Sequence, residues 1–172
     1  KALGLYLNER KEALYELSYQ TGTTLTDARV DIDGGIGTLL AFASKGRREL
    51  PDGHVYLDGD VEQLSRNGTF IGQHICTPLQ GVGVHINAFN FPVWGMLEKL
   101  APSLLAGVPA IIKPASATSY LTEACFQMMI ESDLLPVEVL AEKQLLDSNY
   151  SPKKFGRDRI CEGDEARAAA TI

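Results

Sequence analysis

One asparagine stands where a strand is expected to pass into a helix. Apolar residues alternate from Val82 to Ile86, which is the period of a half-buried strand. Pro92 then opens a helix, since proline suits the first helical position, where its missing N–H has no partner anyway. Asn90 lies between the two elements. Its amide can either donate a hydrogen bond to developing negative charge or serve only as a turn residue before the helix.

A lysine follows the next expected strand. The apolar run from Pro109 to Pro114 is bounded by prolines, is typical of a buried parallel strand and includes Lys113. Apolar residues at helical spacing fill the stretch before it, and Gly107 ends that helix. Residues 82–113 therefore predict one right-handed βαβ unit. Because parallel α/β sheets bind ligands outside the carboxyl ends of their strands, Asn90 and Lys113 should border one crevice.

Two motif-like stretches within residues 28–40 are incomplete. Gly35-x-Gly37 is typical of a dinucleotide loop, but the third glycine is replaced by Leu40 and no acidic residue follows at the proper distance. Asp31-x-Asp33-Gly34 resembles a calcium loop, but it lacks a third ligand before the glycine and the closing glutamate. The favoured interpretation is an amphipathic helix whose glycines allow close packing. Its expected buried residues are Leu39, Leu40 and Phe42.

The remaining elements would support this unit. Residues 1–20 predict an amphipathic helix that Gly22 ends. Turn signals at 66–68 predict a hairpin before an extended segment at 72–76. A last helix, capped by Ser116 or Thr118, should run to about residue 135. The fold class is therefore α/β, a Rossmann-like parallel sheet flanked by helices, incomplete in this chain. We expect residues 1–136 to form one unit and the charged residues 137–172 a tail of unknown fold.

Composition excludes several classes of function. The chain has 172 residues, of which 45% are hydrophobic and 22% charged, an ordinary globular balance. Its net charge of -6 argues against nucleic acid or an anionic membrane as partner, and no apolar run is long enough to span a membrane. The three cysteines and three histidines show no metal-ligand spacing, so we expect no metal site and a reducing, cytoplasmic location. The first residues read as the interior of a helix, which suggests a fragment.

Residues 86–92 (INAFNFP) and 97–114 carry a family resemblance. Together they resemble the aldehyde dehydrogenase superfamily, and within it the branch that oxidises CoA-linked semialdehydes in aerobic phenylacetate and benzoate breakdown, where one such enzyme is half of a bifunctional protein. The similarity extends back through residues 30–38 and covers residues 1–136. It implies an oxidoreductase of aromatic catabolism whose substrate is a small aldehyde, in this branch a CoA thioester, and which is a homo-oligomer at full length.

The resemblance implies a role for each matched residue. Asn90 matches the asparagine whose amide helps to hold the oxyanion of the thiohemiacetal. Lys99 matches a lysine near the active site that the family associates with proton relay. The family's nucleophilic cysteine and basic glutamate have no counterpart here, because Cys76 lies before Asn90 with the wrong spacing and Cys161 is no better placed. We therefore expect the chain alone to turn over no aldehyde.

The resemblance also implies a cofactor site. Asn87, Ala88 and Phe89 match the loop that touches the nucleotide, and Lys113 matches the lysine that bonds the adenosine ribose. Ser116 stands where members that prefer NAD often carry a glutamate. Without that carboxylate a 2′-phosphate meets no repulsion, so NADP is favoured and NAD is the alternative. A second hypothesis is a truncated, non-catalytic homologue with a structural or interaction role.

Overall fold

The computed structural model describes residues 1–135, which form helices around one core, a small parallel sheet and a projecting hairpin. The α-helices are α1 (Ala2–Ser18), α2 (Leu25–Glu49), α3 (Pro92–Leu105) and α4 (Ser119–Glu131). Short 3-10 turns lie at Tyr19–Thr21 and Ser116–Thr118. The strands are β1 (Tyr56–Gln63), β2 (Ile71–Cys76), β3 (Gly83–Ile86) and β4 (Ala110–Lys113).

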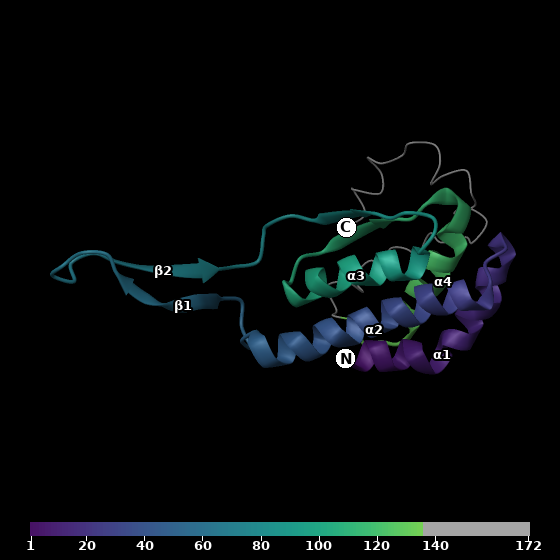
Figure 1. The fold of residues 1–172 in the computed structure, drawn as a ribbon, viewed down its shortest axis with the longest axis horizontal. Coiled ribbons are helices and arrows are strands. Elements are labelled where there is room, and N and C mark those ends of the chain that lie inside the picture. Colours follow the sequence, from purple (N-terminus) through teal and green to yellow (C-terminus); the bar gives the residue numbers. More distant parts are fainter. Residues whose placement is uncertain (136–172) are drawn as a thin grey trace.

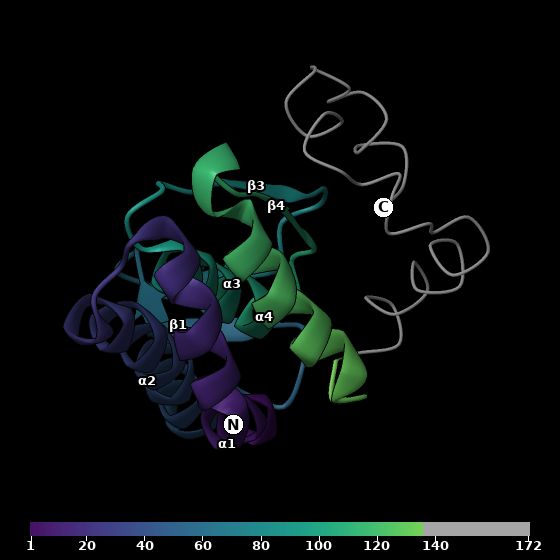
Figure 2. The same ribbon diagram turned by 90° about the vertical axis from the view of Figure 1, so that its right-hand side faces the viewer.

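The four α-helices share one hydrophobic core. In Figure 1, α2 lies between α1 and α3, and the pair β3–β4 covers the other side of α3. Figure 2 shows α4, the last described helix, beside α1. This contact completes the core. The largest side chains that are fully buried come from all four helices: Leu7, Leu14, Ile32, Ile36, Met96, Leu97, Met129, Val93 and Cys125.

The glycines of α2 let α3 approach its backbone. A methyl group on Gly35 would lie 2.9 Å from the Cα atom of Trp94, and one on Gly34 would lie 2.5 Å from the Trp94 ring. Residues 28–40 thus lie inside one helix, and the dinucleotide-loop and calcium-loop alternatives are wrong. The prediction of an amphipathic helix with close-packing glycines is confirmed: Leu39 is buried, and Leu40 and Phe42 pack against the core.

The predicted strand–helix–strand unit is present, with one difference. β3 and β4 pair in parallel, and α3 begins at Pro92 as expected. The apolar side chains of β3, however, are exposed, Val84 to 62% and Ile86 to 69%. Helices cover both faces of a parallel sheet in α/β proteins, and here the described elements cover only the face that bears His85. The prediction of a half-buried apolar face is therefore wrong for residues 1–135.

The expected hairpin forms an arm. β1 pairs with β2 in antiparallel register, and Gly68 in the connecting turn has the positive φ of 71° that glycine tolerates best. Figure 1 shows the arm projecting away from the helices, and every residue of β1 is exposed. Because an isolated two-stranded hairpin is marginally stable in water, we expect the arm to gain stability from contacts beyond its own two strands.

Candidate functional site

The site is built around the loop from Asn87 to Phe91, which follows β3 and leads into α3. Asn90 is exposed, and its side chain makes no hydrogen bond within residues 1–135. The backbone on either side of it is nonetheless fixed. The Asn87 N–H donates to the Lys113 carbonyl over 3.0 Å, which continues the β3–β4 pairing into the loop. An unengaged amide on a fixed backbone is available to donate to a ligand.

Threonines of the last helix and its preceding turn also hold this loop. Thr118 Oγ1 donates to the Phe89 carbonyl over 3.1 Å, and Thr122 Oγ1 donates to the Pro92 carbonyl over 3.4 Å. The predicted cap of α4 is confirmed in position, because Thr118 is its N-cap residue, but the Thr118 hydroxyl makes no capping hydrogen bond and is used on the loop instead. The threonine hydroxyl thus ties the Asn90 loop to α4.

A buried carboxylate from α2 binds the start of α3. Asp31 is 3% exposed; its Oδ1 accepts from the Trp94 N–H over 2.7 Å and its Oδ2 from the Val93 N–H over 3.2 Å. These N–H groups are among the first of the helix, which lack partners within it. The N-cap residue itself, Phe91, has no side-chain cap. Asp31 therefore caps α3 from a neighbouring helix.

Burial raises the pKa of Asp31 from 3.8 to about 6, against the two backbone hydrogen bonds, which lower it. The folded state therefore holds a proton on this group more tightly than the unfolded state. Its contribution to stability is largest below pH 3.8 and is lost as pH rises through about 6. Between pH 4 and 6.5, the contribution of Asp31 to the free energy of unfolding should fall by about 2 kcal/mol, and this fall should be absent in Asp31→Asn. Urea unfolding of wild type and Asp31→Asn across that pH range measures the two free energies of unfolding. Curves of this free energy against pH that run parallel for the two proteins would contradict the prediction.

A second polar group of contacts lies between β3 and the middle of α3. Ser103 Oγ donates to the Lys99 carbonyl over 3.0 Å and lies 3.1 Å from His85 Nε2. When the single hydroxyl hydrogen is used on the carbonyl, the contact with His85 requires Nε2–H as the donor. Burial, and then the charge of Lys99, lower the pKa of His85 below its usual value, which favours the neutral ring.

Lys99 turns back toward the beginning of α3. Its Nζ donates to the Gly95 carbonyl over 2.9 Å and to Glu98 Oε1 over 3.0 Å. A methyl group on Gly95 would lie 3.8 Å from the Asn87 side chain. The buried Asn87 amide has no hydrogen-bond partner within the described residues. Lys99 thus lies one helical turn from Gly95, and within residues 1–135 its Nζ makes no hydrogen bond to Asn90.

The predicted cofactor residues lie at one edge of the sheet. Ile86 is paired with Lys113 at the carboxyl ends of β3 and β4, and the Lys113 side chain is exposed, with its Nζ 3.4 Å from the Pro114 carbonyl. Ala88 and Phe89, which follow β3, and Ser116, which follows β4, are exposed, whereas Asn87 is buried. The topology thus brings the Asn90 loop and Lys113 to neighbouring strand ends.

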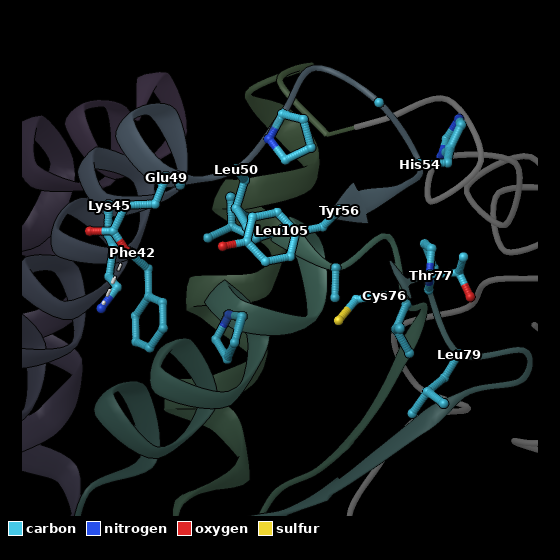
Figure 3. A pocket seen from close by; sticks show the side chains of 17 residues that line it. Phe42, Lys45, Glu49, Leu50, His54, Tyr56, Cys76, Thr77, Leu79 and Leu105 are labelled. Carbon is cyan, nitrogen blue, oxygen red and sulfur yellow. Dashed lines mark ion pairs between the residues drawn. The ribbon is translucent and has the colours of Figure 1, made fainter. Parts of the chain in front are cut away.

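A cavity of about 430 Å³ lies elsewhere in the molecule (Figure 3). Its walls come from the ends of α2 and α3 and from the base of the arm, and Cys76 lines it beside Tyr56. It contains none of the residues predicted for the site. No hydrogen bond to the Cys76 sulfur forms within residues 1–135. Cys161 lies outside the described residues.

The described residues contain no cluster of three or more potential metal ligands. None of their helices is both long and apolar enough to cross a membrane. Sequence reasoning missed Asp31, Thr118 and Thr122 as supports of the loop. For Asp31 a signal existed, because it lies on the apolar face of α2, one turn from Ala28 and Gly35, where a carboxylate is unexpected.

Comparisons with known proteins give consistent matches. Residues 1–142 match the model of the aldehyde dehydrogenase family. A 3,4-dehydroadipyl-CoA semialdehyde dehydrogenase of Aromatoleum evansii is 40% identical over 136 residues, which cover 78% of this chain and 26% of that protein. An alpha-ketoglutaric semialdehyde dehydrogenase of Bacillus subtilis (strain 168) is 32% identical over 111 residues, which cover 63% of this chain and 21% of that protein. The chain spans about a fifth to a quarter of the length of these curated relatives.

The fold has a counterpart among solved structures. The crystal structure of aldehyde dehydrogenase 21 from Physcomitrella patens, in complex with the reaction product succinate, matches with a TM-score of 0.60 and 23% sequence identity. The match covers 74% of this chain and 26% of that one. This likeness shows the fold and confirms the predicted α/β class.

Proposed function

Because the chain belongs to the aldehyde dehydrogenase family, we propose that it serves the oxidation of a CoA-linked semialdehyde to a carboxylic acid. The observation that carries this proposal is the exposed, unengaged amide of Asn90 on a backbone held from three sides. Such a preorganised donor suits an oxyanion that forms when a nucleophile attacks an aldehyde. The name of the A. evansii relative supports the substrate class.

Within this proposal the chain supplies only part of the active site. Asn90 donates to the oxyanion, Lys99 acts as a proton carrier, and Lys113 holds the nucleotide. The nucleophilic cysteine and the basic glutamate have no match among these residues, so the 172-residue chain alone is predicted to be inactive. We propose a cytoplasmic location, which the free thiols of Cys76 and Cys125 support.

The function is tested with the full-length gene product. Reduction of NADP and NAD is followed with a CoA-linked semialdehyde and with the same aldehyde lacking CoA. We expect turnover that prefers the CoA-linked substrate. Absence of turnover with either aldehyde would instead favour the alternative, a truncated homologue with a structural or interaction role. Turnover by the 172-residue chain that Cys76→Ala abolishes would contradict the predicted inactivity.

We propose NADP as the cofactor, which accepts the hydride from the substrate. The residues at the sheet edge fit a 2′-phosphate, because Lys113 offers an exposed ammonium group and residues 113–116 carry no carboxylate. Ser116→Glu should therefore shift the ratio of kcat/KM for NADP over NAD toward NAD by about tenfold or more, since the carboxylate repels the phosphate and can accept from ribose hydroxyls. Steady-state kinetics with both nucleotides measures the shift.

The neighbouring residue provides the control for charge. Ala117 is exposed in the same 3-10 turn, and Ala117→Glu adds an identical charge one position along. We expect this variant to change the nucleotide ratio much less than Ser116→Glu. Equal shifts from the two variants would mean that the effect is one of net charge and not of position 116.

We further propose that the full-length protein is a homo-oligomer that uses the hairpin arm. On one face of the arm, Leu57 and Ile75 are paired across the strands and are 53% and 61% exposed. Exposed apolar surface of this kind marks an interaction site. Ile75→Asp should lower the mass of the assembly measured by light scattering. His74→Asp, on the other face of the same strand, should leave it unchanged; equal masses for all three proteins would contradict the proposal.

A further inference from the structure

The contacts at the start of α3 single out one residue that the resemblance does not assign. We propose that Asp31 is a positioning residue, whose buried carboxylate holds the first turn of α3 and thereby fixes the loop that presents Asn90. This inference rests on the proposed function of Asn90 as an oxyanion donor. Asp31 itself touches neither substrate nor cofactor.

The geometry carries this proposal. Both carboxylate oxygens of Asp31 are used on backbone N–H groups, 2.7 Å from Trp94 N and 3.2 Å from Val93 N. These groups lie three and four residues after Asn90, in the first turn of the helix that the loop enters. Each oxygen thus fixes one peptide plane, so the pair restrains both the position and the direction of the helix start. A loop that ends on a restrained helix presents its side chains in one orientation.

The packing of α2 on α3 makes these bonds possible. Asp31 and Gly35 lie one turn apart on α2, and a methyl group on Gly35 would lie 2.9 Å from Trp94 Cα. Only because the two backbones are this close does a short aspartate side chain reach the N–H groups of α3. Gly35 and Asp31 therefore both contact the first turn of α3, at Val93 and Trp94.

The burial of this charge argues for a role beyond stability. Asp31 is 3% exposed and forms no ion pair with any Lys or Arg among residues 1–135. A buried carboxylate without a cation is destabilising, whereas serine or aspartate at the N-cap position would cap the helix at lower cost. The titratable group that faces it from α4 is the buried thiol of Cys125, whose pKa is raised by burial and then by Asp31.

The test uses four forms of the full-length gene product: wild type, Asp31→Asn, Asn90→Ala and the double variant. Asparagine keeps an acceptor for one N–H group but presents its own N–H₂ to the other. If Asp31 acts through Asn90, Asp31→Asn lowers kcat by about tenfold or more in the wild-type background and has little effect once Asn90 is alanine. An equal loss in both backgrounds would overturn the proposal, because a general structural defect acts regardless of Asn90.

Hydrogen exchange followed by mass spectrometry supplies the second readout. A peptide covering Val93 and Trp94 should exchange faster in Asp31→Asn than in wild type. The matched control is Asp33→Asn on the same helix, whose carboxylate binds Lys11 Nζ and Tyr15 OH of α1 instead, at 2.8 and 2.6 Å. This control should leave the peptide unchanged. Unchanged exchange in Asp31→Asn would overturn the proposal even if kcat fell.

The two readouts separate this inference from the proposed function. If the full-length product turns over no aldehyde, the proposed function fails, and exchange at Val93 and Trp94 still decides whether Asp31 fixes the loop. If turnover is present but Asn90→Ala leaves kcat unchanged, the positioning role of Asp31 is overturned as well, because Asp31 acts through that amide.

Discussion

Asn90→Ala in the full-length gene product is expected to lower kcat by about 10²- to 10³-fold, the loss seen when one oxyanion donor is removed from a preorganised site. The reason is the contrast between the side chain and its backbone. The amide is exposed and unengaged within residues 1–135, while hydrogen bonds fix the residues on both sides of it. The backbone that carries the donor is therefore held before substrate arrives, so less reorganisation is needed in the transition state.

The kinetic pattern distinguishes this role from simple binding. An interaction made only in the transition state lowers kcat and kcat/KM by the same factor, whereas lost uniform binding raises KM alone. Since Asn90 is exposed, its replacement should leave the melting temperature almost unchanged. Asn8→Ala, an exposed asparagine on α1, is the matched control and should keep wild-type kinetics. Turnover of Asn90→Ala within twofold of wild type would mean that Asn90 is only a turn residue.

The sequence predicts the βαβ unit because its signals are local. Alternation before Asn90, proline at the first helical position and the apolar run before Lys113 each depend on neighbours in the chain. The same holds for the hairpin turn and for the glycines of α2. These features decide which element forms at each place, and the structure confirms them.

Features that depend on distant parts of the chain escape such reasoning. Asp31 and Val93 are 62 residues apart, and Thr118 reaches Phe89 across 29 residues. A pattern could mark Asp31 as unusual on an apolar face, but not show which helix it would cap. The exposure of Val84 and Ile86 has a related cause, because alternation shows that one face is apolar but not which element covers it.

The candidate site likewise has a part that local sequence predicts and a part that depends on distant residues. Residues 86–92 are enough to predict Asn90 as an oxyanion donor, and the structure places this residue on a hydrogen-bonded loop after β3. What fixes that loop comes from α2, β4 and the region around α4, through contacts that no short motif contains. The role of each predicted site residue stays a prediction until the kinetics are measured.

Gly35→Val is expected to destabilise the fold by about 3 to 5 kcal/mol, at the upper end of overpacking effects. The obstacle is backbone and not a movable side chain: a Cβ atom on Gly35 would lie 2.9 Å from Trp94 Cα, 3.1 Å from Trp94 N and 3.2 Å from the Val93 carbonyl carbon. To accommodate it, α2 and α3 must separate. That movement would open the core and would also pull Asp31 away from the N–H groups that it caps.

Gly37 offers a control within the same helix. It is exposed, and a Cβ atom there would have no heavy atom within 4 Å. Gly37→Val should therefore change stability by only a few tenths of a kcal/mol, since valine and glycine differ little in helix propensity. Urea unfolding of the 172-residue chain, followed by circular dichroism, compares the two variants with wild type. Similar midpoints for Gly35→Val and Gly37→Val would contradict the close approach of α2 and α3, and with it the geometry that brings Asp31 to the loop of Asn90.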